Sequence, residues 1–435
     1  MYITGRLPVL IGLGVVPVVL LSVGGVDAWL TALGWIVLCT LLAVTDAATA
    51  ADPRLLRVDR HLPRRTLLGE RVETVVTMRN TGRRPVRGLL RDAWQPTAGA
   101  SSRRIPISVA AGDSVSVTVA LRPRRRGELA SEFVVIRSAG PLGLAGRQAR
   151  IAVRGAILVL PPFTARRHLP SRLARLKELD GNTSVQVRGQ GTEFDSLRTY
   201  VRGDDVRSID WRATARAGTT MLRTWRPERD RHVVIVVDTG RTSAARVGDG
   251  VRLDAGMESA LLLSALAARA GDHVHLLMFD RVTRARVSRV EGAALLPALV
   301  DAMAPVEPQL IDTDWDAAFA QIRALAVRPA LVVLLTAQDE PEAARGFLSS
   351  LAGLARGAHV LVGAATDTGL AALASERATA DEVYRAAAAE RALQDAARIA
   401  ALVGRAGAEA IADSPESLPP RIADRYLELK ASGRL

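Results

Sequence analysis

The stretch Gly191-Thr-Glu-Phe-Asp-Ser-Leu-Arg-Thr-Tyr-Val-Arg-Gly-Asp-Asp-Val-Arg-Ser-Ile-Asp-Trp-Arg-Ala-Thr-Ala-Arg216 separates two kinds of sequence and is chemically the densest part of the chain. With its continuation to Arg229 it holds four of the sixteen aromatic residues, Phe194, Tyr200, Trp211 and Trp225. Acids alternate there with arginines: Glu193, Asp195, Asp204, Asp205 and Asp210 with Arg198, Arg202, Arg207, Arg212 and Arg216. Such a mixture fits neither a core strand nor a simple solvated face.

Two apolar runs open the chain, Leu7–Val26 and Ala28–Val44. Each has roughly 17 to 20 residues, which is long enough for a helix to cross the hydrocarbon of a bilayer. A short Gly-Gly-Val-Asp turn joins them, so they predict a transmembrane hairpin. A cleaved signal peptide is the alternative for the first run, but a second apolar run follows it directly instead of a soluble stretch.

Arginines flank this hairpin at both ends, at positions Arg6, Arg54, Arg57, Arg60, Arg64 and Arg65. By the positive-inside rule both ends face the cytoplasm, which predicts a two-helix protein of the cell membrane with its bulk in the cytoplasm.

Between Leu55 and Leu160 the apolar period changes to two. Four stretches read as half-buried strands, Val72–Arg79, Ser114–Leu121, Phe133–Arg137 and Ala149–Val153. Strands this short, separated by turns and without helical patterns between them, predict a small antiparallel sandwich. The arginine run Arg122–Arg126 lacks interleaved aromatic residues, and we expect it to border a strand near lipid. Pro161-Pro162 marks a linker.

After the dense stretch, apolar strands alternate with helical patterns. His232–Asp238 is a continuous β-branched run of the kind that a sheet covered on both faces requires. Further strands are predicted at His273–Asp280, Arg284–Val290 (an edge strand), Ala330–Thr336 and His359–Gly363, and helices at Asp254–Ala270, Ala293–Met303, Asp314–Ala326 and Thr379–Val403. The alternation predicts an α/β domain with a doubly wound, mostly parallel sheet.

The length of the chain predicts more than one domain. The chain has 435 residues, and ordinary domain sizes predict roughly two or three units. The net charge of +13 comes almost wholly from arginine, since the only lysines are Lys177 and Lys430. An arginine excess suits nucleic acid or an anionic membrane surface, and the apolar runs favour the membrane. The single cysteine, Cys39, excludes an internal disulfide.

The run G-x-E-F-D-x-L-R-x-Y-x-x-G-D-D-x-R-x-I-D-W-x-x-T-A-R resembles the signature of the bacterial DUF58 family, and Tyr426–Leu435 resembles its usual C-terminus. The resemblance implies a von Willebrand factor A-like α/β domain after the signature. We therefore expect a transmembrane hairpin at 1–50, a β-sandwich-like domain at 51–160, the signature segment at 161–230, the von Willebrand A-like domain at 231–413 and a C-terminal tail at 414–435.

The same resemblance implies a divalent-cation site in loops at the carboxyl ends of the strands, built on an Asp-x-Ser-x-Ser element. Here that element is Asp238-Thr-Gly-Arg-Thr242, with glycine in place of the first serine. Thr313 matches a second-loop threonine, and Thr336-Ala337 stands where Ser-Asp is usual, with Asp339 displaced by two positions. Asp238, Thr242 and Thr313 thus form a degenerate candidate site for Mg²⁺. We expect no other cofactor. Alternatively, Asp238 caps the loop after its strand.

The signature segment has two interpretations. In the first, its acids and arginines pair with one another and Tyr200 and Trp211 are packed anchors. In the second, it is a recognition surface for a protein partner, because arginine and tryptophan are common at binding hot spots. The residues that carry either interpretation are Glu193, Phe194, Arg198, Tyr200, Gly203, Asp204, Arg207, Asp210, Trp211 and Arg216.

Catalytic patterns are missing from the sequence. Its six histidines are scattered without a Ser/His/Asp or Cys/His arrangement, and no Gly-x-x-x-x-Gly-Lys phosphate loop is present. His273 and His275 would share a strand face, but a metal would need a third ligand. We therefore expect no enzyme. A hydrolase using Asp204 or Asp210 is the alternative, and it lacks a nucleophile.

The sequence thus favours a membrane-anchored scaffold or adaptor that acts through protein contacts and binds no nucleic acid. By resemblance, the partner is a MoxR-type AAA+ ATPase, and the process is the assembly or activation of other proteins. A divalent-cation-dependent ligand-binding module is the alternative. The sequence does not determine the oligomeric state.

Overall fold

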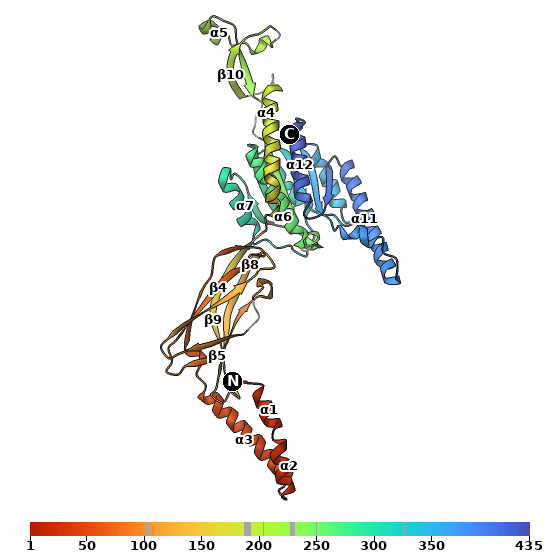
Figure 1. Ribbon diagram of the computed structural model, residues 1–435. Helices are drawn as coiled ribbons and strands as arrows, with labels where there is room; N and C mark the ends of the chain where they lie inside the picture. The colour runs from red at the N-terminus through yellow and green to blue at the C-terminus, as the bar shows by residue number, and fades with distance from the viewer. Residues whose placement is uncertain (101–103, 187–192, 203, 227–230, 249, 326) are drawn as a thin grey trace. The chain divides into compact units, whose positions relative to one another are not determined.

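The computed structural model describes residues 1–435 except 101–103, 187–192, 203, 227–230, 249 and 326 (Figure 1). For residues 180–186, 193–196 and 224–226 it describes the backbone alone. The predictions on Gly203 and on the side chains of Glu193 and Phe194 therefore lie outside the described residues. The chain divides into two compact units, Met1–Leu160 and Pro161–Leu435.

The first unit begins with three apolar helices, α1 (Arg6–Gly12), α2 (Val15–Val23) and α3 (Ala28–Thr49). They form two spans that are long and apolar enough to cross a membrane, which confirms the predicted apolar pair. The break between α1 and α2 lies one turn before Pro17, whose ring clashes with the carbonyl four residues earlier. Asp27 caps α3 by accepting the backbone N–H groups of Trp29 and Leu30.

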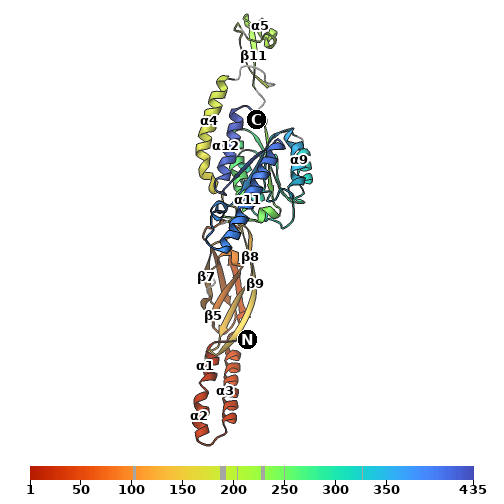
Figure 2. The same cartoon turned by 90° about the vertical axis from the view of Figure 1, so that its right-hand side faces the viewer.

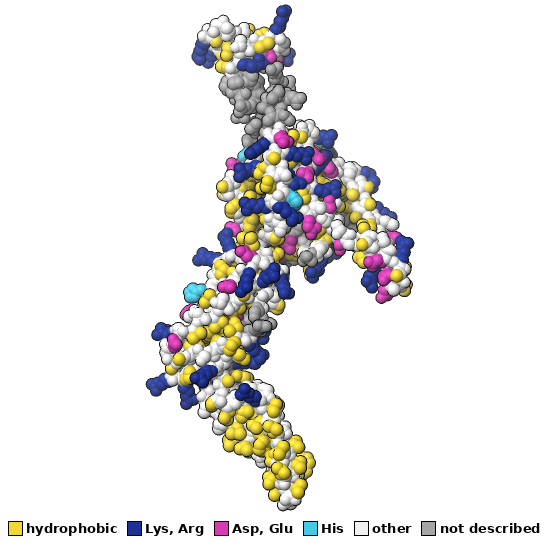
Figure 3. Space-filling view, in the orientation of Figure 1, with side chains coloured by type: hydrophobic (Ala, Val, Ile, Leu, Met, Phe, Trp, Pro, Cys, Tyr) yellow, Lys and Arg dark blue, Asp and Glu magenta, His cyan; other side chains and the backbone are white. Residues whose placement is uncertain are grey.

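The two spans pack side by side and leave most of their apolar surface uncovered (Figure 2). Trp35 of α3 donates from Nε1 to the carbonyl of Leu10 at 3.1 Å. A Cβ at Gly14 would lie 2.2 Å from the Trp35 ring, so this close approach requires glycine. Only 11% of the 18-residue apolar window of each span is buried, and Val23 and Trp29 are 86% and 85% exposed. Apolar side chains accordingly cover the surface of the helices (Figure 3). Exposed apolar surface of this extent calls for an apolar surrounding.

Two β-sheets follow the helices. The larger has the order β1-β9-β8-β5-β6, with β3 parallel to β9 and the other pairs antiparallel. Its strands are β1 (Tyr2–Ile3), β3 (Arg65–Leu67), β5 (Val86–Trp94), β6 (Ile105–Val109), β8 (Gly127–Ala139) and β9 (Ala145–Leu160). The smaller is antiparallel and has the order β2-β4-β7, with β2 (Leu56–His61), β4 (Val72–Asn80) and β7 (Ser114–Leu121).

The two sheets pack face to face around a shared core. Met78 of the smaller sheet and Leu90 and Ile136 of the larger are fully buried in one cluster. A bidentate ion pair lies nearby, with Arg60 Nη2 2.7 Å from Asp92 Oδ1 and the two side chains 1% and 2% exposed. The four predicted strands lie in β4, β7, β8 and β9. The antiparallel sheets predicted from the period of two are therefore present. Strands β2, β5 and β6 were not predicted from that period.

The apolar helices are tied to one end of this sandwich. Asp46, in the last turn of α3, is 1% exposed and accepts backbone N–H groups from Leu142, Leu144 and Ala145 at 2.7 to 3.0 Å. These residues belong to the turn between β8 and β9. At the other end of the helices, β1 pairs with β9 through Tyr2 and Gly146. Both ends of the helical segment are thereby fixed to the sandwich.

The arginine run Arg122–Arg126 occupies a different place from the one we predicted. It connects β7 to β8 and precedes Gly127, whereas the helices contact the turn that follows Ala139. A strand rises about 3.3 Å per residue, so the length of β8 separates the arginine run from the turn that contacts the helices by roughly 40 Å. The expectation that this run borders lipid was wrong, because charge pattern alone does not tell which end of a strand faces the helices.

The second unit contains a six-stranded sheet of order β16-β15-β12-β17-β18-β19. Neighbouring strands from β15 to β19 are parallel, and β16 is an antiparallel edge strand. The strands are β12 (His232–Asp238), β15 (His273–Phe279), β16 (Thr283–Val287), β17 (Pro329–Leu335), β18 (His359–Ala365) and β19 (Glu409–Asp413). The mixed α/β organisation expected from the sequence is thus confirmed, with a sheet that is only partly parallel.

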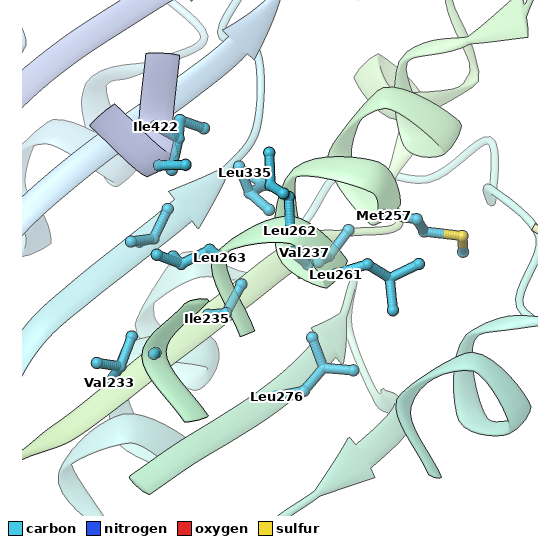
Figure 4. Packing of buried hydrophobic residues seen from close by; sticks show 14 of the residues in the cluster. Val233, Ile235, Val237, Met257, Leu261, Leu262, Leu263, Leu276, Leu335 and Ile422 are labelled. Carbon is cyan, nitrogen blue, oxygen red and sulfur yellow. The ribbon is translucent and has the colours of Figure 1, made fainter. Parts of the chain in front are cut away.

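Helices cover both faces of this sheet. They are α6 (Arg252–Arg269), α7 (Leu295–Met303), α8 (Trp315–Arg323), α9 (Arg345–Ala355), α11 (Ala380–Arg405) and α12 (Leu418–Ala431). Outside them, α4 (Leu169–Gln186) packs on α6 and α12, and α10 (Gly369–Leu373) packs on α11. Ile235 of β12 belongs to a cluster with Leu261 of α6 and Ile422 of α12 (Figure 4). Its neighbour Val236 faces the opposite cluster, with Phe319 and Phe347. Burial on both faces accounts for the unbroken apolar run of β12.

Short elements complete the described chain. They are the 3-10 turns η1 (Pro53–Leu55), η2 (Pro96–Ala98), η3 (Thr164–His168), η5 (Arg241–Ala244) and η6 (Gly292–Ala294), and the two-residue strands β13 (Arg246–Val247) and β14 (Gly250–Val251).

The expected C-terminal tail is a core helix. In α12, Tyr426 and Leu427 are fully buried, and the Tyr426 hydroxyl donates to Asp272 Oδ2 at 2.5 Å. The segment after Pro161-Pro162 also packs on the α/β domain, since Leu176 of α4 joins the same core and Arg172 pairs with Asp424 at 2.6 Å. The buried residues Leu418, Ile422, Tyr426 and Leu429 of α12 recur at helical spacing, so the signal for a core helix was present in the sequence.

Candidate functional site

The strand order places one carboxylate at the point where the sheet changes direction. Starting from β12, the chain moves to β15 on one side and later to β17 on the other. Ligands of open α/β sheets bind outside the carboxyl ends of strands at such a point. Asp238 ends β12, Asp280 follows β15 and Thr336 follows β17. This carboxyl edge is therefore the expected position of a ligand site.

Asp238 is 2% exposed and all of its described partners are donors from the protein. Its Oδ1 accepts the Thr313 hydroxyl at 2.5 Å and the Gly240 N–H at 2.8 Å. Its Oδ2 accepts the Thr336 hydroxyl at 2.6 Å and the Thr242 hydroxyl at 3.2 Å. Burial raises the pKa of Asp238 and outweighs the hydroxyl and N–H donors, which act to lower it. Three loops thus close around one carboxyl group.

Gly240 explains why this cluster is compact. It occupies the position of the first serine in the cation-binding pattern. A Cβ there would lie 2.3 Å from Thr313 Oγ1 and 2.9 Å from the Ile311 carbonyl. A serine would therefore displace the Thr313 hydroxyl from Asp238. The glycine and the Thr313 contact belong to the same arrangement.

Two further carboxylates of this edge, Asp339 and Asp312, form ion pairs with arginines. Arg252 Nη1 lies 2.6 Å from Asp339 Oδ1, the carboxylate that could have replaced the missing aspartate ligand. Arg241 pairs with Asp312 at 3.1 Å on the surface. Each pairing removes negative charge that a small divalent ion needs to offset its dehydration.

Asp280 is held in a different state from Asp238. It is fully buried and accepts from Arg284 Nε at 2.6 Å, from the Thr239 hydroxyl at 2.9 Å and from the N–H groups of Arg281 and Val282. Burial acts to raise its pKa, but these donors together lower it below the usual value. Asp280 is therefore an ionised internal anchor of the β15–β16 connection.

The predicted residues Asp238, Thr242 and Thr313 come together in the structure. The Asp238 carboxyl group accepts four donors of the protein there. Among the described residues, no group of three His, Cys, Asp or Glu side chains is arranged to hold a metal. The arrangement fits a closed hydroxyl–carboxyl cluster that stabilises the switch point.

The signature segment forms a small module, Glu193–Arg226. Strands β10 (Glu193–Thr199) and β11 (Met221–Arg226) pair antiparallel, and η4 (Val206–Ser208) and α5 (Trp211–Ala217) lie between them. Arg198 forms a bidentate pair with Asp204 at 2.8 and 2.7 Å. The described charges of this module therefore brace its own connection, as the first interpretation expected.

Asp210 is the central brace of the module. Its Oδ1 caps α5 by accepting the N–H groups of Arg212 and Ala213 at 3.0 Å, and its Oδ2 lies 2.7 Å from Arg223 Nε of β11. The Ala213 N–H and then the Arg223 side chain lower the pKa of Asp210. Asp205 caps η4 in the same way through the Arg207 N–H. These contacts join the helix to the hairpin.

The aromatic residues do not follow the first interpretation. Trp211 is 70% exposed, and Val201 and Val206 are 62% and 61% exposed. Tyr200 is half-buried and donates its backbone N–H to the Thr220 carbonyl at 2.8 Å. Trp211 therefore does not pack against the rest of its own module, where it is the first residue of α5 after the capping Asp210. Arg207 and Arg216 are also exposed.

A histidine cluster was missed in the sequence. His232 begins β12 directly opposite His273 of β15, with ring centroids 5.0 Å apart. His232 Nδ1 lies 3.0 Å from Nε2 of His275, which is 8% exposed, and burial followed by the other two rings lowers the pKa of His275. His273 Nδ1 pairs with Glu291 at 2.9 Å. The signal was present, since two parallel strands both begin with histidine.

The described chain is thus a protein with apolar N-terminal helices, a β-sandwich and an α/β domain that carries a braced signature module. Residues 196–368 match the family described as "Protein of unknown function DUF58", and over this range the resemblance drawn from the signature is confirmed. No curated protein matches the chain.

Solved structures are similar over about a quarter of the chain. The ASH/PapD-like domain 7 of human CEP192 is 17% identical, with 24% of this chain and 86% of that chain covered and a TM-score of 0.19. A FixG-related protein from Vibrio parahaemolyticus is 9% identical, with coverages of 24% and 96% and a TM-score of 0.19. The CARDB domain of PF1109 from Pyrococcus furiosus is 11% identical, with coverages of 26% and 90% and a TM-score of 0.18.

Proposed function

We propose that this protein is a membrane-anchored, non-enzymatic scaffold that recruits a protein partner through its signature module. The observation that carries the proposal is the exposed Trp211 on a module braced by the internal Arg198–Asp204 and Arg223–Asp210 pairs. Tryptophan at 70% exposure is poorly placed for stability, whereas buried in an interface it is among the most effective hot-spot residues. The exposed Arg207 and Arg216 are of the second residue type enriched there.

Anchorage in the membrane is supported by the helices. Their apolar surface is almost uncovered, and their ends are fixed to the sandwich through Asp46 and through β1. A pairing strand before the first helix favours retention of that helix over cleavage as a signal peptide. With arginines at both ends, the sandwich and the α/β domain lie in the cytoplasm and the hairpin spans the cell membrane as two helices.

The α/β domain in this proposal is von Willebrand A-like and works without a bound cation. The closed Asp238 cluster supports this part, because its hydroxyls serve the protein's own carboxyl group. The signature acids likewise serve as helix caps and ion-pair partners, which leaves a hydrolase without free carboxylates in the described module. The strand that follows the module, β12, lies inside the sheet of this domain.

The partner we propose is a MoxR-type AAA+ ATPase, which acts with the scaffold in the assembly or activation of other proteins. The test is affinity purification of the tagged full-length chain from detergent-solubilised membranes, followed by identification of ATPase subunits. Trp211→Ala is compared with Tyr384→Ala, which removes an aromatic side chain that is 78% exposed on α11.

We expect the wild-type chain and Tyr384→Ala to retain the ATPase and Trp211→Ala to lose at least about 90% of it, as for a residue at a hot spot. Absence of any ATPase from the wild-type sample, or equal retention by both variants, would contradict the proposal.

A further inference from the structure

We propose that the helix-facing end of the β-sandwich binds the headgroups of anionic phospholipids through an arginine collar, Arg54, Arg57, Arg79, Arg83, Arg84 and Arg147. The inference rests on the membrane anchorage proposed above and adds to it a specific lipid class and binding surface. Phosphate is the anion that arginine recognises best, because its planar donors match two phosphate oxygens.

The collar surrounds the end of α3. Arg84 donates from Nη1 to the carbonyl of Thr49 at 3.0 Å. Arg147 donates from Nε to the Ala47 carbonyl and from Nη2 to the Ala48 carbonyl, both at 3.1 Å. These guanidinium groups therefore lie level with the last turn of the apolar helix. Lipid headgroups begin where an apolar span ends, so the collar is at headgroup depth.

A pair of like charges points to an anionic ligand. Arg57 of β2 lies directly opposite Arg79 of β4 in the antiparallel register, and both side chains are exposed. Like charges at such positions destabilise a strand pair. A negatively charged group that bridges the two guanidinium groups would reverse the sign of this interaction. The Arg57–Arg79 pair therefore destabilises the free protein, and binding of an anion between the two side chains removes this repulsion.

The nearby carboxylates offset only a small part of the collar's charge. Asp46 is buried and holds three backbone N–H groups. Asp52 lies 3.8 Å from Arg147 and also accepts the Arg54 N–H. Asp113 accepts the Ser114 N–H, and Asp59 lies two residues further along β2, opposite Thr77. Positive charge therefore dominates beside the helices (Figure 3).

The opposite end of the sandwich supplies a matched control. Arg64 and Arg124 are exposed there, and the length of β8 separates them from the collar by roughly 30 to 40 Å. Arg154 is exposed about 23 Å from the collar, since it lies seven residues beyond Arg147 on β9. This separation is several times the Debye length of about 8 Å at physiological salt. Their removal changes net charge by the same amount as removal of three collar arginines, without acting at headgroup depth.

The experiment uses the full-length chain in vesicles of phosphatidylcholine alone and of phosphatidylcholine with phosphatidylglycerol. Arg57→Gln/Arg79→Gln/Arg83→Gln is compared with Arg64→Gln/Arg124→Gln/Arg154→Gln. Lipid retained by the chain after brief detergent extraction is measured by mass spectrometry, and carbonate extraction of the vesicles reports insertion.

We expect the wild-type chain and the control variant to enrich phosphatidylglycerol, and the collar variant to lose at least about tenfold of that enrichment, since each surface arginine contributes about fivefold. In phosphatidylcholine alone, Arg57→Gln should raise the unfolding temperature because it removes the like-charge pair. Absence of enrichment in the wild-type chain, or equal loss in both variants, would overturn the collar while leaving the anchorage intact. Extraction of the wild-type chain by carbonate would instead remove the anchorage and the collar with it.

Discussion

The carboxyl edge of the α/β sheet and the signature module both pair polar groups internally, but they differ in what they leave exposed. At the edge, three threonine hydroxyls donate to the buried carboxyl group of Asp238, and the threonines themselves are buried or half-buried. In the module, charges also pair internally, but Trp211 stays outside. A site that has satisfied its own polar groups has little left for a ligand, whereas an exposed aromatic residue has its whole surface available.

This difference favours the signature module over the carboxyl edge as the region that binds a partner. Family resemblance directs attention to the edge, where an Asp-Thr-Gly-Arg-Thr element replaces a cation-binding pattern. The contacts direct attention to the module instead. Gly240 admits the Thr313 hydroxyl to Asp238, and Arg252 takes Asp339, so each departure from the pattern is matched by an internal contact.

The largest effect is expected for removal of the carboxyl group at the edge. Asp238→Ala leaves the buried Thr336 hydroxyl and two half-buried threonine hydroxyls without their acceptor and should lower the free energy of unfolding by about 2 to 4 kcal/mol. Asp238→Asn keeps an acceptor and should cost about 1 kcal/mol. Denaturant titration of the full-length chain measures both. Similar stability of Asp238→Ala and the surface variant Asp312→Ala would show that the cluster does not support the fold.

The next effect separates stability from binding in the module. Trp211→Ala should weaken partner binding by about 2 kcal/mol, or roughly thirtyfold. The same change should alter the free energy of unfolding by less than about 0.5 kcal/mol because the side chain is exposed. Binding is measured by surface plasmon resonance with the purified partner. A large loss of stability in Trp211→Ala would show that Trp211 is a packed anchor.

Asp210→Ala tests the internal bracing of the module. Loss of the N-cap and of the Arg223 pair should raise amide hydrogen exchange in residues 211–217 by roughly fivefold, while exchange in β12 stays unchanged. Arg216→Ala, on the same helix but outside these contacts, serves as the control. Unchanged exchange in the Asp210 variant would mean that α5 is held by other contacts.

A smaller effect follows from the lowered pKa of Asp280. A carboxyl group whose pKa is lowered in the folded state stabilises the protein above its unfolded value of about 3.9, and this stabilisation is lost as pH falls through the folded pKa. The stability difference between the wild-type chain and Asp280→Asn should therefore be largest near neutral pH and shrink below about pH 4. A difference that grows on acidification would contradict the ionised state of Asp280.

Magnesium should have the smallest effect of all. Because the edge cluster is closed, millimolar MgCl₂ should shift the thermal midpoint of the full-length chain by less than about 1 °C beyond a matched NaCl control. A saturable rise that Thr313→Val abolishes would restore the cation-dependent alternative.

Local sequence patterns were sufficient for much of the architecture. The apolar runs predicted the N-terminal helices, the period of two predicted antiparallel strands, and the unbroken run of β12 predicted a strand covered on both faces. These features depend on residues close together in the chain. The signature residues likewise identified the DUF58 range before any fold was known.

Contacts between distant segments lay beyond such patterns. Asp238 and Thr336 are 98 positions apart in the chain, and His232 and His275 are 43 apart, yet both pairs form hydrogen bonds. The burial of Tyr426 and the exposure of Trp211 are of the same kind, since each depends on what other elements cover. The sequence by itself determined the apolar N-terminal helices, most strands of the α/β sheet and the resemblance to DUF58 because period, order and signature residues are local properties. Only the tertiary structure decided that the edge is closed and the module open, because burial depends on strand order and packing across the whole fold.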